Sequence, residues 1–265
     1  MIILKLGGSV LTKKNLTTPE IDYDNLNRIC EEIKGSFAKK NKKLIIVHGA
    51  GSFGHPPAKK YNIGKKFNME EFPEKRIGFS KTQNAVKKLN MEICDVFIDN
   101  DLPVVSLQPS TFIKTSNGRI KIANLNLIKD YLENNFIPVL YGDVVLDDLL
   151  KIAVLSGDQI IQFLAKNLKS DKIILGTDVD GVEKKNPKTN NDAVLFKEFN
   201  SLSDLDSFDN TTNVDVTGGM LGKIKELLEL ADLGIESTII NINKEKNVYK
   251  ALENKDVKGT IISKK

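Results

Sequence analysis

The chain of 265 residues is poor in the residues that mark several classes of protein. It has no tryptophan and two cysteines, and aromatic residues make up 6% of it. Cys30 and Cys94 lie far apart within helical apolar patterns, so we expect buried reduced thiols rather than a disulfide or a metal site. No apolar run approaches the ~20 residues that cross a bilayer. The first ten residues, MIILKLGGSV, lack the basic segment and long apolar core of a signal peptide, so we expect a cytoplasmic protein.

Positive charge is present but diffuse. Lys and Arg number 39 against 35 Asp and Glu, which gives a formal net charge of +4. The lysines alternate with acidic residues and aromatic residues are few, so a surface for single-stranded nucleic acid is not indicated. Diffuse positive charge fits the attraction of a small anionic substrate.

Apolar residues alternate between short runs and longer helical stripes, a pattern typical of helices covering a largely parallel sheet. The pattern predicts an α/β protein with a largely parallel sheet, and composition leaves open one large domain or two halves that share the sheet. The predicted strands are 2–6, 44–47, 104–107, 137–140, 173–175, 238–242 and 260–262, and the clearest helical stripes are 26–37, 86–96 and 221–231.

Other local signals predict features outside that regular pattern. Asn117-Gly118 separates two apolar segments and predicts a β-hairpin over residues 112–122, at the side of the main sheet. Residues 62–76 and 184–213 are rich in polar side chains and predict surface loops or lids.

The segment 44–55, LIIVHGAGSFGH, joins an apolar strand to glycines at positions 49, 51 and 54. This spacing is that of a dinucleotide-binding fingerprint, which also requires a second strand ending in Asp or Glu about 20 residues later. Residues 68–76 contain acids but no apolar strand, so that interpretation fails. Pro56 and Pro57 are suited to the first turn of a helix. We therefore interpret the segment as an anion-binding loop.

Glycine loops follow strand-like segments at four places. They are Gly7-Gly8-Ser9, residues 49–54, Ser156-Gly157-Asp158 and residues 217–222. The carboxyl ends of strands in an open α/β sheet meet at one crevice, where backbone N–H groups and helix N-termini bind phosphates. Several phosphates along one crevice indicate a phosphotransferase. A Walker A motif is absent, because residues 218–223 are one residue too short and Ile224 follows them.

Two lysines accompany these loops. Lys5 interrupts the apolar strand 2–6, and because a buried ammonium group needs negative charge, we expect it to face a polar site. The alternative is a lysine on the solvent face of an edge strand. Lys223 is expected in the first turn of a helix, where a cation opposes the helix dipole unless an anion is bound. A surface lysine whose stem covers apolar atoms is the alternative there.

Five motifs, KLGGSV, VHGAGSFGH, SGD, TDVDGV and DVTGGMLGK, in this order resemble the amino acid kinase superfamily over residues 2 to about 262. Within it the chain is most similar to the archaeal type of isopentenyl phosphate kinases, because His55 follows GSFG, where those enzymes bind the substrate phosphate. The titration range of histidine suits that task. Ala50 replaces a usual glycine, and its amide can still donate if its φ is negative. We interpret His48 as structural.

The resemblance implies a single amino acid kinase domain over residues 1–265, a three-layer α/β/α sandwich with an open, mainly parallel central sheet. It also implies transfer of a phosphoryl group from ATP to isopentenyl phosphate, with Mg²⁺ on the nucleotide and no protein metal ligands. The catalytic residues that it implies are Lys5, Lys14, His55, Asp158 and Lys223, with Asp158 orienting the lysines. For ATP it implies Lys5, Gly7, Gly8, Ser9, Gly51, Thr177, Asp178, Asp180, Gly181, Gly218, Gly219 and Lys223, and for the acceptor Gly49, Ala50, Gly54, His55 and Gly157.

The resemblance further implies a homodimer, an acceptor-binding half over about 1–165 and a nucleotide-binding half over about 166–265. Several alternatives stay open. The acceptor could be acetylglutamate, aspartate or UMP, as in other members of the superfamily, or the chain could bind ATP or an anion without catalysis. Asp180-Gly181 could be an ordinary turn. The five-carbon tail needs an apolar pocket, and we expect one wall from residues 77–98, with Phe79, Gln83 and Val86 as candidates.

Overall fold

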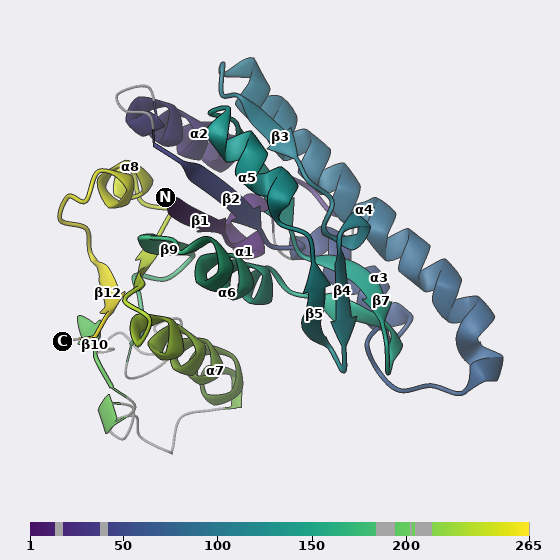
Figure 1. Cartoon of the computed structure of the whole chain (residues 1–265). Helices are drawn as coiled ribbons and strands as arrows, with labels where there is room; N and C mark the ends of the chain where they lie inside the picture. The colour runs from purple at the N-terminus through teal and green to yellow at the C-terminus, as the bar shows by residue number, and fades with distance from the viewer. Residues whose placement is uncertain (14–17, 38–41, 184–193, 202, 205–213, 265) are drawn as a thin grey trace.

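The computed structural model describes residues 1–13, 18–37, 42–183, 194–201, 203–204 and 214–264, and residues 214–222 by their backbone alone. Within these residues, eight strands form one sheet in the order β10-β12-β11-β9-β1-β2-β6-β3 (Figure 1). They are β1 (Ile2–Leu6), β2 (Leu44–His48), β3 (Val104–Ser106), β6 (Ile137–Tyr141), β9 (Lys172–Thr177), β10 (Glu198–Phe199), β11 (Glu236–Asn241) and β12 (Gly259–Ile262). Neighbouring strands are parallel except β11 and β12, which are antiparallel.

Helices cover both faces of this sheet (Figure 1). One face packs against α2 (Tyr23–Phe37), α4 (Phe72–Asp99) and α8 (Asn247–Leu252), and the other against α5 (Asn126–Glu133), α6 (Gly157–Leu168) and α7 (Val214–Ala231). With both faces covered, β2 and β6 are buried at every position, which is why central strands appear in the sequence as continuous apolar runs. The predicted three-layer, mainly parallel fold is confirmed.

A second sheet forms within the described residues from β4 (Ile113–Ser116), β5 (Arg119–Ala123), β7 (Asp143–Asp147) and β8 (Lys151–Leu155), in the order β5-β4-β7-β8. The predicted Asn117-Gly118 hairpin is therefore correct. It joins this second sheet through β4, which pairs with β7. The Asp147 carboxylate fixes this arrangement by accepting the N–H groups of Asn117 and Gly118 at 3.1 and 2.8 Å.

Three further local predictions need correction. Pro56 and Pro57 lie inside α3 (Gly51–Lys60) rather than at its start, because the helix already begins within the glycine segment. Residues 62–76 are not a loop throughout, since a short 3₁₀ helix (Met69–Glu71) leads into α4 at Phe72. Of residues 184–213, positions 184–193, 202 and 205–213 lie outside the described residues, and β10 forms at Glu198–Phe199.

Cys30 and Cys94 are free and buried, as predicted. Burial raises the pKa of both thiols to about 12, so neither is a thiolate near neutral pH. None of the helices in the described part of the chain combines the length and apolar character needed to cross a membrane.

Candidate active site

A cleft of about 440 Å³ opens at the carboxyl ends of β1, β2 and β9. This is the edge at which parallel α/β sheets bind ligands. Most of the residues predicted for the site line the cleft, namely Lys5, Gly7, Gly8, Ser9, Gly49, Ala50, Gly51, Gly54, His55, Gly157, Asp158, Thr177, Asp178 and Lys223. Three of the four predicted glycine loops thus meet in one cavity.

The first two glycine loops pack directly backbone against backbone. A Cβ atom on Gly8 would lie 2.5 Å from the backbone nitrogen of Gly51, and one on Gly49 would lie 2.7 Å from the nitrogen of Gly8. Gly51 also has a φ of +51°, in the left-handed region that favours glycine. We call Gly8, Gly49 and Gly51 the glycine junction, and it fixes α1 (Gly8–Leu11) against the start of α3.

Two other features complete this junction. The Thr12 hydroxyl donates to the carbonyl oxygen of Gly8 at 2.8 Å and accepts the N–H of Ser52 at 3.2 Å, so one side chain links the two loops. Ala50 has φ −72° and ψ −19°. This ordinary helical conformation explains why alanine replaces glycine there without strain.

Lys5, Asp158 and Lys223 form the charged cluster of the cleft. Lys5 donates a hydrogen bond to Asp158, whose other carboxylate oxygen lies 3.3 Å from the Lys223 ammonium nitrogen. The edge-strand alternative for Lys5 is wrong, because β1 lies between β2 and β9 and the side chain is only 12% exposed. Burial lowers the pKa of Lys5, and the two ammonium groups hold the pKa of Asp158 below its ordinary value against the effect of its burial.

The segment before Lys223 departs from the prediction. Gly218 and Gly219 lie within α7, which already begins at Val214, so they do not form a loop before a helix. Lys223 is accordingly in the middle of α7 rather than in its first turn, although it does line the cleft. Glycine disfavours a helix by only about 1 kcal/mol per residue, so the glycine-rich sequence did not exclude one.

The two histidines have opposite surroundings. His48 is fully buried and stacks on Tyr141 with ring centroids 5.4 Å apart. Its Nδ1 lies 2.9 Å from the carbonyl oxygen of Gly49, so Nδ1 carries the proton and Nε2 accepts from the Asn90 amide at 3.1 Å. Burial lowers the pKa of His48 to about 4. The structural interpretation of His48 is confirmed, whereas His55 is exposed on α3 and lines the cleft.

Only part of the TDVDG segment, residues 177–181, lines the cleft. Thr177, Asp178 and Val179 line the cleft. Asp180 is not among the lining residues, and it is held by Asn241, Lys244 and Lys258 at 3.1, 2.8 and 2.6 Å. Although burial opposes the shift, hydrogen bonds from these three side chains lower the pKa of Asp180 to about 2. The predicted ATP contact of Asp180 therefore has no counterpart in the lining of the cleft.

Gly181, the next residue, is buried with a φ of +152°, and a Cβ atom there would lie 2.5 Å from the Thr260 hydroxyl oxygen. This packing is what a structural glycine requires. Lys14, another predicted catalytic residue, lies outside the described residues.

One end of the cleft is apolar, and sequence analysis found only part of it. Its walls are Ala58 from α3, Thr82 and Val86 from α4, Val144 from β7, and Val154 and Leu155 from β8. Val86 was expected, but Gln83 instead donates to Ser110, and Phe79 packs in a neighbouring cluster with Ile63 and Ile152. The β7–β8 hairpin was missed, although the short apolar runs 144–146 and 152–155 around an Asp-Asp turn were a signal for it.

Asp143, at the start of β7, also lines the cleft and was not predicted. It accepts the N–H of Ser110 at 3.1 Å, and its burial raises the pKa of its carboxyl group. Among the described residues, no three His, Cys, Asp or Glu side chains gather where they could hold a metal ion.

Comparison with known proteins agrees with this site. The amino acid kinase family matches residues 1–241. The chain is 52% identical over 268 residues to the isopentenyl phosphate kinase of Methanothermobacter thermautotrophicus, covering 100% of both chains. It is 42% identical to that of Methanocaldococcus jannaschii, covering 99% of this chain and 98% of the relative. A crystal structure of an isopentenyl phosphate kinase matches with a TM-score of 0.88 and 48% identity over 99% of each chain. The chain therefore belongs to the amino acid kinase family and, within it, to the isopentenyl phosphate kinases.

Proposed function

We propose that this cleft transfers the γ-phosphoryl group of ATP to isopentenyl phosphate, giving isopentenyl diphosphate and ADP. One observation carries the proposal: the charged cluster, the glycine junction, His55 and the apolar walls all line a single cavity. A phosphate with a short hydrocarbon tail has one polar and one apolar end, and this cavity offers both kinds of surface. The two relatives above, each named an isopentenyl phosphate kinase, support the same substrate.

The nucleophile in this reaction is an oxygen of the acceptor phosphate, which is already anionic. A general base is therefore unnecessary, and the protein contributes alignment and neutralisation of charge. Lys5 supplies positive charge at the transferring phosphoryl group and Lys223 supplies it at the nucleotide phosphates, and Asp158 holds both ammonium groups by its two oxygens. The resemblance adds Lys14 to this set, with a role at the same phosphoryl group.

We assign the acceptor phosphate to the loop that leads into α3. Gly49, Ala50, Gly54 and Gly157 offer backbone at this end of the cleft, and His55 offers its imidazole. The partial positive charge at the start of α3 adds to the attraction for a phosphate. The walls formed by Val86, Val144 and Val154 then receive the tail. In this arrangement residues 1–165 supply most of the acceptor site.

We assign ATP to the other side, where residues 166–265 supply most of the site. Its phosphates lie against Gly7, Gly8, Ser9 and Gly51. Thr177 and Asp178 also line this side of the cleft, and we call residues 177–180 its rim. The further residues that the resemblance implies there are Asp180, Gly181, Gly218 and Gly219. Mg²⁺ neutralises charge on the triphosphate when it is bound. The described residues fit a metal that arrives on the nucleotide, because Asp158 is already engaged by two lysines.

The proposal is tested by steady-state kinetics with His55→Ala. Purified protein with Mg-ATP should phosphorylate isopentenyl phosphate, and the variant should raise KM for this acceptor on the order of tenfold or more by losing a charge-assisted hydrogen bond. Lys59→Ala is the matched control, because Lys59 is an exposed cation on the same helix that does not line the cleft. An unchanged acceptor KM in His55→Ala would refute the assigned role.

A panel of acceptors tests the substrate itself. Isopentenyl phosphate should be the preferred acceptor over acetylglutamate, aspartate and UMP, and preference for any of these three overturns the proposal. ATP binding without formation of ADP in the presence of every acceptor would favour a non-enzymatic sensor.

We also propose a homodimer, for which light scattering should give twice the mass of the 29.5 kDa chain.

A further inference from the structure

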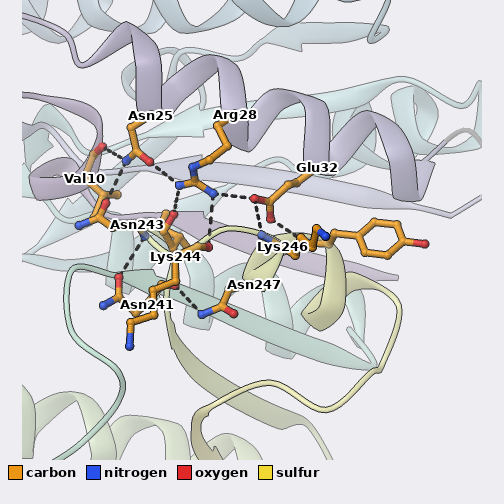
Figure 2. Close-up of polar contacts among 11 residues, drawn as sticks. Val10, Asn25, Arg28, Glu32, Asn241, Asn243, Lys244, Lys246 and Asn247 are labelled. Atoms are coloured by element: carbon orange, nitrogen blue, oxygen red, sulfur yellow. Dashed lines mark hydrogen bonds and ion pairs between the residues drawn. The ribbon is translucent and has the colours of Figure 1, made fainter.

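A polar network on α2 connects α1 with the loop between β11 and α8 (Figure 2). Asn25, Arg28 and Glu32 lie three and four residues apart, so they share one face of the helix. This face is directed at α1 on one side and at the loop between β11 and α8 on the other. We call these three side chains and the backbone groups that they hold the Arg28 network.

Arg28 is the centre of this network. Its guanidinium donates to the Glu32 carboxylate at 2.6 Å and to the Asn25 side-chain oxygen. It also donates to two carbonyl oxygens of the β11–α8 loop, those of Ile242 and, at 3.4 Å, of Lys244. Glu32 in turn accepts the N–H of Lys246 at 2.8 Å and that of Tyr249 at 3.1 Å. Two side chains of α2 therefore satisfy four backbone groups of the β11–α8 loop and the first turn of α8.

The network reaches the cleft by two routes on this side. The N–H of Ile242, whose carbonyl Arg28 holds, donates to the carbonyl oxygen of Thr177 at 3.0 Å, and Thr177 lines the cleft. Asn241 is the residue before Ile242, and its side-chain amide donates to Asp180 at 3.1 Å. The rim of the cleft over residues 177–180 is therefore fixed to a loop whose own position depends on Arg28.

The same network also holds α1. The Asn25 amide donates to the carbonyl oxygen of Val10 at 2.7 Å and to the side chain of Asn243 at 2.9 Å. Val10 belongs to α1, whose first residues Gly8 and Ser9 line the cleft. One chain of hydrogen bonds therefore runs from α1 through Asn25 and Arg28 to the 177–180 rim.

We propose that Arg28 is a positioning residue for the nucleotide, which sets the separation between α1 and residues 177–180 without touching the substrates. The inference rests on the proposed function in placing ATP on this side of the cleft. A planar guanidinium suits the task because it donates in several fixed directions at once. Its charge is also retained at any ordinary pH, so the spacing does not depend on protonation.

A purely structural role is the competing explanation, and the chain contains a matched control for it. Lys42 donates to Glu253, to the carbonyl oxygen of Leu252 at 2.9 Å and to Ser36 at 3.0 Å. The side chains of Lys42 and Glu253 are 18% and 10% exposed, close to the 22% and 10% of Arg28 and Glu32. Both pairs join the same layer of helices, but Lys42 precedes β2 and so lies at the end of the sheet away from the cleft.

The experiment compares Arg28→Met with Lys42→Met in the full chain. For each variant, steady-state kinetics give kcat and the KM for ATP and for isopentenyl phosphate, calorimetry gives the Kd for ADP, and thermal unfolding gives Tm. Arg28→Met should raise the KM for ATP and the Kd for ADP on the order of tenfold through a displaced rim, and leave the acceptor KM within about twofold. Lys42→Met should lower Tm by about as much as Arg28→Met does, but it should change neither the KM for ATP nor the Kd for ADP.

Several outcomes overturn the inference. If Arg28→Met and Lys42→Met have the same KM for ATP and the same Kd for ADP, the role of Arg28 is structural. The same conclusion follows if Arg28→Met raises the KM for ATP and the KM for isopentenyl phosphate equally. If Arg28→Met does not fold, Asn25→Ala replaces it. This variant keeps the Arg28–Glu32 pair and the bonds of Arg28 to the β11–α8 loop, and it removes the contacts of Asn25 with Val10, Asn243 and the Arg28 guanidinium. A smaller rise of the same selective kind is then expected, and no rise refutes the inference. Failure of the wild type to phosphorylate isopentenyl phosphate counts against the proposed function alone, since ADP binding is measured separately.

Discussion

The glycine junction and the Arg28 network solve the same problem in opposite ways. Each fixes α1 against another segment beside the cleft. At the junction, Gly8 and Gly51 bring two backbones together by having no side chains, and a single Cβ atom would collide with a backbone nitrogen at 2.5 Å. In the network, Asn25, Arg28 and Glu32 bridge a wider gap with long polar side chains.

This difference teaches how each region tolerates change. Close backbone contact cannot adjust, because interiors are packed densely and main-chain atoms cannot rotate away. A network of side chains can lose one member and keep others, so its failure is graded. We therefore expect the junction to fail abruptly on substitution and the Arg28 network to weaken by degrees.

Breaking the junction should have the largest effect. Gly8→Ala places a Cβ atom against Gly51, and the resulting shift of the phosphate loops should lower kcat/KM on the order of 100-fold. Gly35→Ala is the control, since a Cβ atom there would meet only the Tyr249 ring at 3.7 Å. That variant should keep full activity and gain about 0.5–1 kcal/mol of stability in its helix. Comparable activity in the two variants would contradict the close packing of the junction.

Acid should also separate the two regions, by an effect of similar size on stability. Burial lowers the folded-state pKa of His48 from 6.5 to about 4, so the unfolded chain binds a proton in this window that the folded chain does not. The free energy of unfolding should therefore fall by up to about 3 kcal/mol as the pH drops through the window. His48 ends the strand that carries Gly49, whereas the Arg28 guanidinium stays charged in acid.

Urea unfolding at a series of pH values measures this effect. His48→Asn should flatten the dependence between pH 6.5 and 4. A wild-type slope in His48→Asn would show that His48 is not the group responsible.

The smallest effect concerns the side chain that completes the junction. Thr12→Val removes a buried hydroxyl that joins Gly8 and Ser52, and should lower the free energy of unfolding by about 1–2 kcal/mol. Thr12→Ser keeps the hydroxyl and should retain most of the stability and the wild-type acceptor KM. Identical unfolding curves for Thr12→Val and Thr12→Ser would show that the hydrogen bonds of Thr12 do not contribute to the free energy of unfolding.

The sequence predicted those parts of the fold and site that depend on local signals. Apolar runs located β1, β2 and β9, because strands buried on both faces need apolar side chains at successive positions. Glycines at strand ends located the loops of the cleft, and the buried position of Lys5 predicted a charged partner, which is Asp158. Each of these signals lies within a few residues of the feature that it predicts.

Errors arose where a local signal had two structural outcomes. Gly218 and Gly219 resembled a loop but lie in α7, and β7, the strand that the hairpin at Asn117 joins, was not predicted. The turn chemistry of Asn117-Gly118 was correct, but a turn does not specify which strand its hairpin joins. The hairpin β7–β8 supplies Val144 and Val154 to the apolar end of the cleft, and it was missed for lack of a strong turn signal.

By itself the sequence determined the alternation of strands and helices, the order of the phosphate-binding loops and the family to which they belong. Only the tertiary structure decided that Asp180 is engaged by two lysines outside the lining of the cleft, and that Arg28 is bonded to the β11–α8 loop. The physical reason is distance along the chain. Arg28 meets Ile242, which lies 214 positions further along the chain, and such a contact exists only after the sheet has brought α2 and the β11–α8 loop together.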